Sequence, residues 1–301
     1  MKEIVLMLLL TASLAGSALS ASLDLSAYGR LILTNFATAP FPHPSRASGH
    51  TYDGTNYDAA THYSDSTVAL FIPQGFRATP AVDFVIHFHG WRNTVAGTLE
   101  QFQLAEQLAA SGRNAILIVP EGPHDAPDSA GGKLEDSRGF QHFLAEAISV
   151  LQQLNVISNA ARPGRIILSG HSGGYRVMAG ILDRGGLTDH IREVWLFDAL
   201  YANSDSFLNW AASGPHRLLD IYTDHGGTLE NSQAMIATLR QRGQNSQTLL
   251  ATNETSLNPV DLTTHAYVFL HSDQVHNDVV ARHKTFQEFL ATSCLSPIPP
   301  N

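Results

Sequence analysis

Short apolar segments alternate with longer amphipathic segments along most of the chain. The short segments are rich in Val, Ile, Leu and Phe, which is typical of strands that are covered on both faces. They lie at 67–72, 82–88, 114–119, 165–168, 193–197, 217–222 and 266–270. Strands that alternate with helices predict an α/β fold, with a mostly parallel central sheet and helices on both faces.

The amphipathic segments carry apolar residues three or four positions apart, which predicts helices that pack one face against the sheet. They lie at 98–111, 139–154, 175–182, 231–242 and 278–290. Residues 34–64 are rich in Pro, Gly, Ser, Thr and His and are interpreted as an irregular surface segment. We see no internal repeat, so the pattern predicts a single domain over 21–301 with its core at about 66–291.

The first twenty residues have the features of a secretory signal peptide. Lys2 is followed by an apolar run at 4–14 and by the small residues Ala18 and Ser20, at the positions that a signal peptidase reads. The run is too short to span a bilayer as a resident helix. We therefore expect cleavage before Ala21 and export to a periplasm or out of the cell. A buried N-terminal helix is the alternative.

Composition narrows the range of partners. The 301 residues are 44% hydrophobic, enough for a sizeable core, and the formal net charge of −9 argues against nucleic acid or an anionic membrane as the main partner. The only cysteine, Cys294, lies in a Pro-rich tail, which excludes an intrachain disulfide and a cysteine-ligated zinc site. The oligomeric state stays open.

A Gly-x-Ser-x-Gly segment at 170–174 joins the predicted strand at 165–168 to the predicted helix at 175–182. A serine on a sharp strand-to-helix turn stands clear of its own backbone and can meet a base, so Ser172 is a candidate nucleophile. We expect glycine at 170 and 174 because side chains there would collide with the neighbouring strand and helix. The alternative is an ordinary turn.

With its surroundings, this segment resembles the nucleophile elbow of the α/β-hydrolase family. The resemblance covers roughly residues 66–291 and also rests on the His89-Gly90-Trp91 turn after an apolar strand and on His276 after the last predicted strand. It implies a serine hydrolase whose catalytic residues come in the order serine, acid, histidine. It does not identify the substrate.

Among the fifteen histidines, His271 and His276 both follow the last predicted strand closely. His276 opens a predicted helical stretch, as the base of the resembled family does, and we favour it over His271. We expect His171 to pack behind the elbow. Histidines in loop-like surroundings are interpreted as surface residues; they are His62, His124, His225 and His265.

Two aspartates stand at strand ends between Ser172 and the base. Asp198 has apolar neighbours that imply burial, and a buried carboxylate needs hydrogen-bond partners such as an imidazole N–H. Its setting resembles the acid of pancreatic-type lipases, whereas Asp224 occupies the commoner acid position of the wider family. We favour Asp198, and Asp224 stays open as an acid or as a turn residue before two glycines.

An oxyanion hole requires backbone N–H groups that face the reacting carbonyl oxygen. The N–H of Gly173 is one candidate, and the N–H of Trp91 is the other, with Gly90 allowing close approach. The alternative places Trp91 in the core. His87 and His89 share one face of a strand and resemble half a metal site, but the chain continues Gly-Trp, so we expect no metal and no cofactor there.

These observations predict an exported serine hydrolase, most consistent with a carboxylic-ester hydrolase that forms an acyl-enzyme on Ser172. Its substrate would be a small-molecule or polymer-linked ester, and loop residues 121–128 are candidates for lining the cleft. A serine peptidase of the same fold and a non-catalytic binding scaffold are the alternatives.

Overall fold

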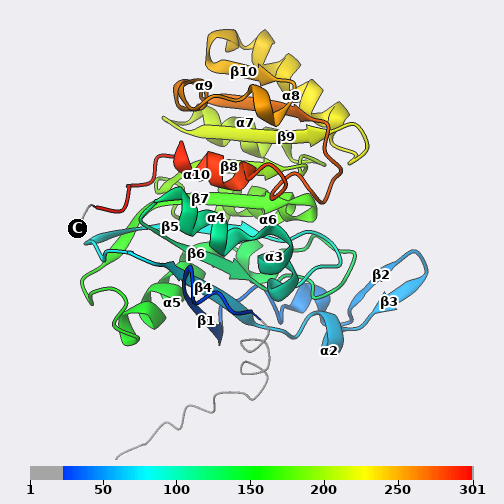
Figure 1. Cartoon of the computed structure of the whole chain (residues 1–301). Coiled ribbons are helices and arrows are strands. Elements are labelled where there is room, and N and C mark those ends of the chain that lie inside the picture. The colour runs from blue at the N-terminus through cyan, green and yellow to red at the C-terminus, as the bar shows by residue number, and fades with distance from the viewer. Residues whose placement is uncertain (1–22, 300–301) are drawn as a thin grey trace, which may run out of the picture.

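The computed structural model describes residues 23–299, so the predicted signal segment lies outside the described residues. Nine strands of this part of the chain form one twisted sheet in the order β1-β4-β6-β5-β7-β8-β9-β11-β10. Only β4 runs against the others, because it pairs antiparallel with both β1 and β6. The predicted α/β class and mostly parallel sheet are confirmed (Figure 1).

All seven predicted strands are present, with ends that differ by a few residues. The sheet consists of β1 (Gly29–Asn35), β4 (Thr67–Pro73), β5 (Ala81–Phe88), β6 (Ala115–Pro120), β7 (Arg162–His171), β8 (Ile191–Phe197), β9 (Arg217–Thr223), β10 (Thr248–Ala251) and β11 (Tyr267–Ser272). The two edge strands, β1 and β10, were not predicted. Both are only partly buried and lack the continuous apolar run of the inner strands.

Helices cover both faces of the sheet, as the periodicity predicts. One face carries α3 (Val95–Phe102), α4 (Leu104–Ser111), α9 (Pro259–Thr264) and α10 (Thr285–Ala291), and the other carries α5 (Gly139–Gln153), α6 (Tyr175–Gly180), α7 (Ser204–Ala212) and α8 (Leu229–Gln241). The core is thus divided into two apolar layers, one on each side of the sheet. None of the helices over residues 23–299 is both long and apolar enough to cross a bilayer.

The helix predicted at 98–111 is two helices in the structure. Gln103 has a left-handed φ of 49° and separates α3 from α4. The side chain of Gln107 donates to the carbonyl oxygens of Phe102, at 2.7 Å, and Val280, at 3.2 Å. This amide therefore satisfies a carbonyl group that the break removes from the helical pattern.

Two further expectations need correction. The helix predicted at 278–290 is limited to α10, which begins at Thr285, so His276 opens a run of turns instead of a helix. The segment at 34–64 is less irregular than expected, because it holds a hairpin of β2 (His50–Tyr52) and β3 (Thr55–Tyr57) and the short helix α2 (Ala59–His62). Phe36, Phe41 and Tyr63 from this segment are fully buried.

The strands also place the candidate residues. The chain leaves β5, β6, β7, β8, β9 and β11 at the same edge of the sheet, because these strands are parallel neighbours. The oxyanion candidates, Ser172, both candidate aspartates and His276 follow these strands directly or within four residues. The fold therefore gathers them along one edge.

A carboxyl group in the core gives the fold a pH dependence. Asp220 of β9 is 1% exposed, and its Oδ2 accepts a hydrogen bond of 2.6 Å from the Ser232 hydroxyl. Burial raises the pKa of Asp220 to about 7. A carboxyl whose pKa is raised on folding stabilises the native state at low pH, and this contribution is lost as pH rises toward the folded pKa.

We expect Asp220→Asn to remove this pH dependence. Between about pH 4, the ordinary value for an aspartate, and about pH 7, the wild-type protein should lose up to about 1.4 kcal/mol of unfolding free energy per pH unit from this group. Urea unfolding at several pH values measures the slope. A variant that loses stability over this range as steeply as the wild type would contradict the assignment.

Candidate active site

Ser172 lies at the tip of a strained turn directly after β7. Its φ of 52° is in the left-handed region, which a non-glycine residue rarely adopts. One 3₁₀ turn, Ser172–Gly174, then leads into α6. The serine is therefore held on a sharp strand-to-helix turn, the geometry that exposes a nucleophilic hydroxyl.

The glycines around this turn are required by close packing. A Cβ at Gly170 would lie 2.8 Å from the Met178 Cε of α6, and one at Gly174 would lie 2.7 Å from the carbonyl oxygen of Phe88 in β5. The expected collisions with helix and strand are confirmed. A Cβ at Gly90 would lie 2.5 Å from the Cβ of Ser172, so this loop also needs glycine to approach the serine.

Asp198 and His276 form a hydrogen-bonded pair. The His276 Nδ1–H donates to Asp198 Oδ2 at 2.6 Å, which leaves the Nε2 lone pair free to accept a proton. Asp198 is completely buried, and the remaining capacity of its carboxylate is used by Thr223 and Thr228. Burial raises the pKa of Asp198, but the hydrogen bonds from His276, Thr228 and Thr223 outweigh burial, so the net shift is downward.

Asp224 has a different partner. Its Oδ1 lies 2.8 Å from the Nε2 of His271, and both side chains are substantially exposed, by 60% and 37% respectively. The structure therefore pairs each candidate aspartate with a different candidate histidine. Of the two pairs, only Asp198–His276 reaches the cavity that Ser172 lines, because His276 is part of that lining.

Gly226, the first of the two glycines in the turn after β9, lets that turn pack against the buried aspartate. A Cβ at Gly226 would lie 1.8 Å from Asp198 Oδ2, so the turn after β9 can fold over the carboxylate only because this residue is glycine. The Gly226 N–H donates to Thr223 Oγ1 at 2.9 Å, and that hydroxyl in turn donates to Asp198 at 2.8 Å. The turn thus orders the donors around the carboxylate.

Sequence reasoning missed Tyr201, which follows Asp198 by three positions. Its hydroxyl donates to the Gly226 carbonyl oxygen at 2.5 Å and also interacts with the Ser172 side chain. Burial and the nearby charge of Asp198 raise the pKa of Tyr201 to about 12, so the hydroxyl stays protonated at neutral pH. The sequence signal that could have identified Tyr201 was its position, three residues after Asp198 at the same sheet edge.

His171 has a more specific position than packing behind the elbow. Its Nε2–H donates to the backbone oxygen of His276 at 2.9 Å, and the two ring centroids are 4.5 Å apart. Burial and the neighbouring His276 lower the pKa of His171 to about 3. The ring therefore stays neutral near pH 7 and does not oppose a positive charge on His276.

Trp91 lies beside the elbow but not in the core. Its side chain is 43% exposed, and its indole N–H donates to Ser129 Oγ at 2.8 Å. A Cβ on Gly173 would lie 2.7 Å from Ser129 Oγ and 2.8 Å from Trp91 Cδ1. The backbone of Gly173 and the Trp91 loop are thus close neighbours. Two backbone segments that donate N–H groups to one oxyanion need this proximity.

A cavity of about 590 Å³ opens directly above Ser172. It is lined by aromatic, amide and charged side chains together with the candidate residues, namely Trp91, Arg92, Asn93, Gln101, Ser129, His171, Ser172, Gly173, Tyr175, Tyr201, His276 and Asn277. Its volume is in the range of small-molecule sites.

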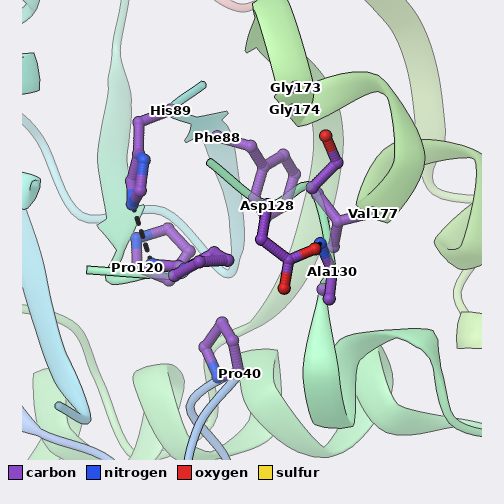
Figure 2. Close-up of a pocket in the computed structure, with 13 residues that line it drawn as sticks. Pro40, Phe88, His89, Pro120, Asp128, Ala130, Gly173, Gly174 and Val177 are labelled. Atoms are coloured by element: carbon purple, nitrogen blue, oxygen red, sulfur yellow. Dashed lines mark hydrogen bonds between the residues drawn. The ribbon is translucent and has the colours of Figure 1, made fainter. Parts of the chain in front are cut away.

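A second cavity lies behind the elbow, among Phe88, His89, Pro120, Gly173 and Val177 (Figure 2). At about 20 Å³ it has room for about one water molecule, too little for a substrate group. The larger cavity is therefore the candidate binding site.

The loop expected at 121–128 contributes little to the large cavity. Glu121 is 2% exposed, and Asp128 is held by Arg46 at 2.6 Å and 2.9 Å, whereas Ser129, just beyond the predicted stretch, lines the cavity.

His87 is buried, with Nδ1 2.9 Å from the Ser169 hydroxyl. His89 instead reaches the Gly122 N–H at 2.9 Å, so the two histidines meet different partners.

Comparison with known proteins identifies the fold. No protein-family model matches the sequence, and no curated protein matches it significantly. The structure resembles the feruloyl esterase module of Clostridium thermocellum, an S954A mutant complexed with sinapinate, with a TM-score of 0.50 at 10% identity over 88% of each chain. It also resembles a ferulic acid esterase, with a TM-score of 0.53 at 10% identity over 88% of this chain and 97% of the other.

At this level of identity the comparison establishes architecture alone. The agreement covers 88% of this chain in both comparisons. With the strand order and the strand-to-helix turn at Ser172, it leads to one conclusion: the chain has the α/β-hydrolase fold.

Proposed function

We propose that the protein is a serine hydrolase that cleaves carboxylic esters, with Ser172 as nucleophile, His276 as base and Asp198 as the acid that orients the base. The observation that supports this proposal most strongly is that His276, which lines the same cavity as the strained Ser172, pairs with a buried Asp198 at 2.6 Å. The two esterases of similar fold support ester chemistry. Export remains a prediction from the sequence.

In the proposed reaction, Ser172 Oγ attacks the acyl carbon while His276 Nε2 takes the hydroxyl proton. Asp198 keeps the proton of the neutral ring on Nδ1 and stabilises the imidazolium that forms. The C–O bond of the ester breaks, and the departing alcohol takes the proton from Nε2. Water then attacks the acyl-enzyme by the same route, which releases the acid and restores the serine.

The N–H groups of Gly173 and Trp91 are the proposed donors to the oxyanion. Gly90 supports this role because its missing side chain lets the Trp91 loop lie against Ser172. Each such donor is typically worth about 100–1000-fold in rate. A buried, hydrogen-bonded Asp198 and a strained Ser172 also favour an enzyme over a binding scaffold, since a scaffold needs neither.

We expect a fluorophosphonate probe to label Ser172 alone, because among the serines of residues 23–299 only Ser172 combines a strained turn with a neighbouring base. Peptide mass spectrometry locates the label, and ester hydrolysis is measured on Ser172→Ala and on Ser149→Ala, an exposed serine of α5, as a matched control. Ser172→Ala should lose at least about 1000-fold in kcat. Labelling of another residue, or normal turnover by Ser172→Ala, would refute the proposal.

We expect Asp198→Asn and Asp224→Asn to differ widely. The first should lower kcat by about 10⁴-fold, because the imidazole can then adopt the wrong tautomer, and the second should stay within about tenfold of the wild type. Circular dichroism and thermal melting confirm that both variants are folded. A folded but inactive Asp224→Asn would instead identify Asp224, one strand along the sheet, as the acid.

We expect short acyl chains to be preferred. The cavity presents polar groups of Arg92, Asn93, Gln101 and Asn277, which would lose hydration against a long alkyl chain. From p-nitrophenyl butyrate to the palmitate, kcat/KM should fall at least about tenfold. A lipase that accepts palmitate, assayed in the same detergent, controls for solubility. Higher kcat/KM on palmitate would contradict this interpretation of the lining.

A further inference from the structure

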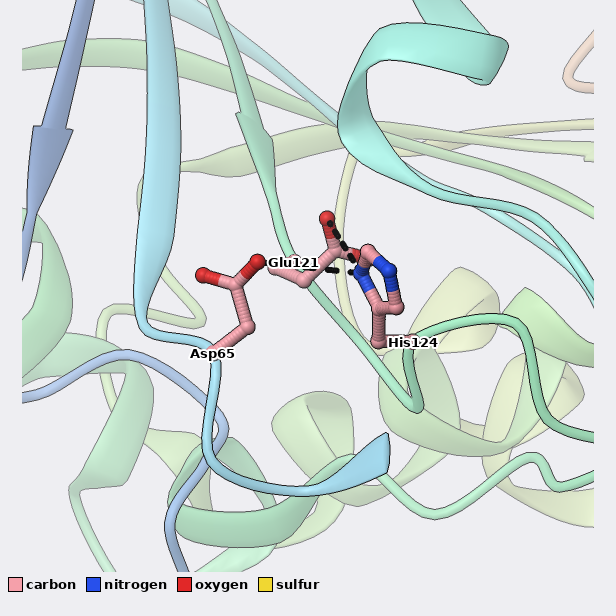
Figure 3. A group of neighbouring side chains, drawn as sticks. All are labelled: Asp65, Glu121 and His124. Atoms are coloured by element: carbon pink, nitrogen blue, oxygen red, sulfur yellow. Dashed lines mark ion pairs between the residues drawn. The ribbon is translucent and has the colours of Figure 1, made fainter. Parts of the chain in front are cut away.

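Three potential metal ligands meet at the sheet edge, outside the residues of the proposed reaction. Asp65 precedes β4, Glu121 follows β6, and His124 lies three residues further along the same loop (Figure 3). One ligand atom from each lies within 4.8 Å of the others. Because β4 runs against β6, the start of one strand and the end of the other bring these side chains together.

Glu121 is buried, and among residues 23–299 its ion-pair partners are two histidines, His89 and His124, with no lysine or arginine. Its side chain is 2% exposed, and its Oε2 accepts a hydrogen bond of 3.0 Å from the Val95 N–H. Its Oε1 lies 3.2 Å from His89 Nε2, yet has no hydrogen-bond donor among residues 23–299. A buried carboxylate in such a position is costly unless a positive charge compensates it.

His89 cannot supply that charge. Its Nδ1–H donates to the Gly90 carbonyl oxygen at 2.8 Å, and its Nε2 accepts from the Gly122 N–H at 2.9 Å. An imidazole that donates from one nitrogen and accepts at the other is neutral. His89 Nε2 therefore lies 3.2 Å from Glu121 Oε1 and offers it no proton.

The spacing around His124 fits a metal ion better than a hydrogen bond. His124 Nδ1 lies 3.6 Å from Asp65 Oδ2 and 3.6 Å from Glu121 Oε2, which is too long for hydrogen bonding. Ligands about 2.1 Å from a tetrahedral zinc ion lie about 3.4 Å from one another. The buried Nδ1 has no hydrogen-bond partner among the described residues.

The backbone and neighbouring donors hold these ligands in place. The His124 N–H donates to the His62 carbonyl oxygen at 2.9 Å, and the His124 carbonyl oxygen accepts from His62 Nδ1 at 2.7 Å. Asp65 Oδ1 accepts from the Thr67 N–H at 2.8 Å, which leaves Oδ2 directed at His124. The cluster thus has the fixed second layer of hydrogen bonds that metal sites require.

We propose that Asp65, Glu121 and His124 bind one divalent transition-metal ion of the zinc type. Two carboxylates and a neutral imidazole balance its charge, and the imidazole favours zinc over calcium or magnesium, which prefer oxygen ligands. The ion is structural. It braces the loop at 121–126 against the Trp91 loop, where Glu121 already holds Val95 and the Asp125 N–H donates to the Asn93 carbonyl oxygen at 3.1 Å.

The test is zinc binding by untagged protein that has been stripped with EDTA. Isothermal titration with ZnCl₂ should give one site, and His124→Gln and Asp65→Asn should each weaken it at least about tenfold. The double variant Asp224→Asn/His271→Gln is the matched control, because it removes another Asp–His pair and should bind like the wild type. Glu121→Gln is avoided because it alters the buried core of the loop.

Thermal melting and two further titrations test whether the zinc site involves these ligands. Bound zinc should raise the melting temperature of the wild type and the control by several degrees, and that of the two ligand variants by much less. The titration is repeated on Ser172→Ala, so that zinc binding is assessed independently of hydrolysis. Absence of zinc binding, unchanged affinity in His124→Gln, or tighter binding of CaCl₂ than of ZnCl₂ would overturn the proposal.

Discussion

The carboxylate of Asp198 is the constraint around which the sheet edge is organised. A completely buried charge needs hydrogen bonds in every direction, and here they come from the end of β9, from the turn before α8 and from the loop after β11. Gly226 must lack a side chain for its turn to close over the carboxylate. The position of His276 therefore follows from satisfying a buried charge, not from the path of the last strand alone.

A second constraint is the close approach of backbone around Ser172. The left-handed serine is held between β5 and α6, and each contact is possible only because a glycine faces it. Strain of this kind persists only where the surrounding packing fixes it, and it is common at functional sites. The tightly packed core on both sides of β7 provides that support, since its last six residues are buried.

The sequence predicted the inner strands and most helices because inner strands are apolar on both faces and the helices are amphipathic. It could not predict the break at Gln103, because both halves keep a helical period and the break depends on Gln107 and the distant Val280. The sequence favoured Asp198 but left Asp224 open as the acid. Both stand at strand ends, and they differ in partners from other strands: the threonines around Asp198 and the exposed His271 beside Asp224.

The loops beyond β5 and β6 show how the two sides of the elbow depend on each other. His89 is fixed as a neutral acceptor by Gly122, and this fixes the start of the Trp91 loop, but the same tautomer leaves Glu121 without a proton donor at Oε1. A hydrogen bond that orders one loop thus leaves the negatively charged Glu121 of the next loop with one oxygen that has no donor. A cation between Asp65, Glu121 and His124 would compensate that charge without disturbing His89, which is why the cluster belongs to the support of the site and not to its chemistry.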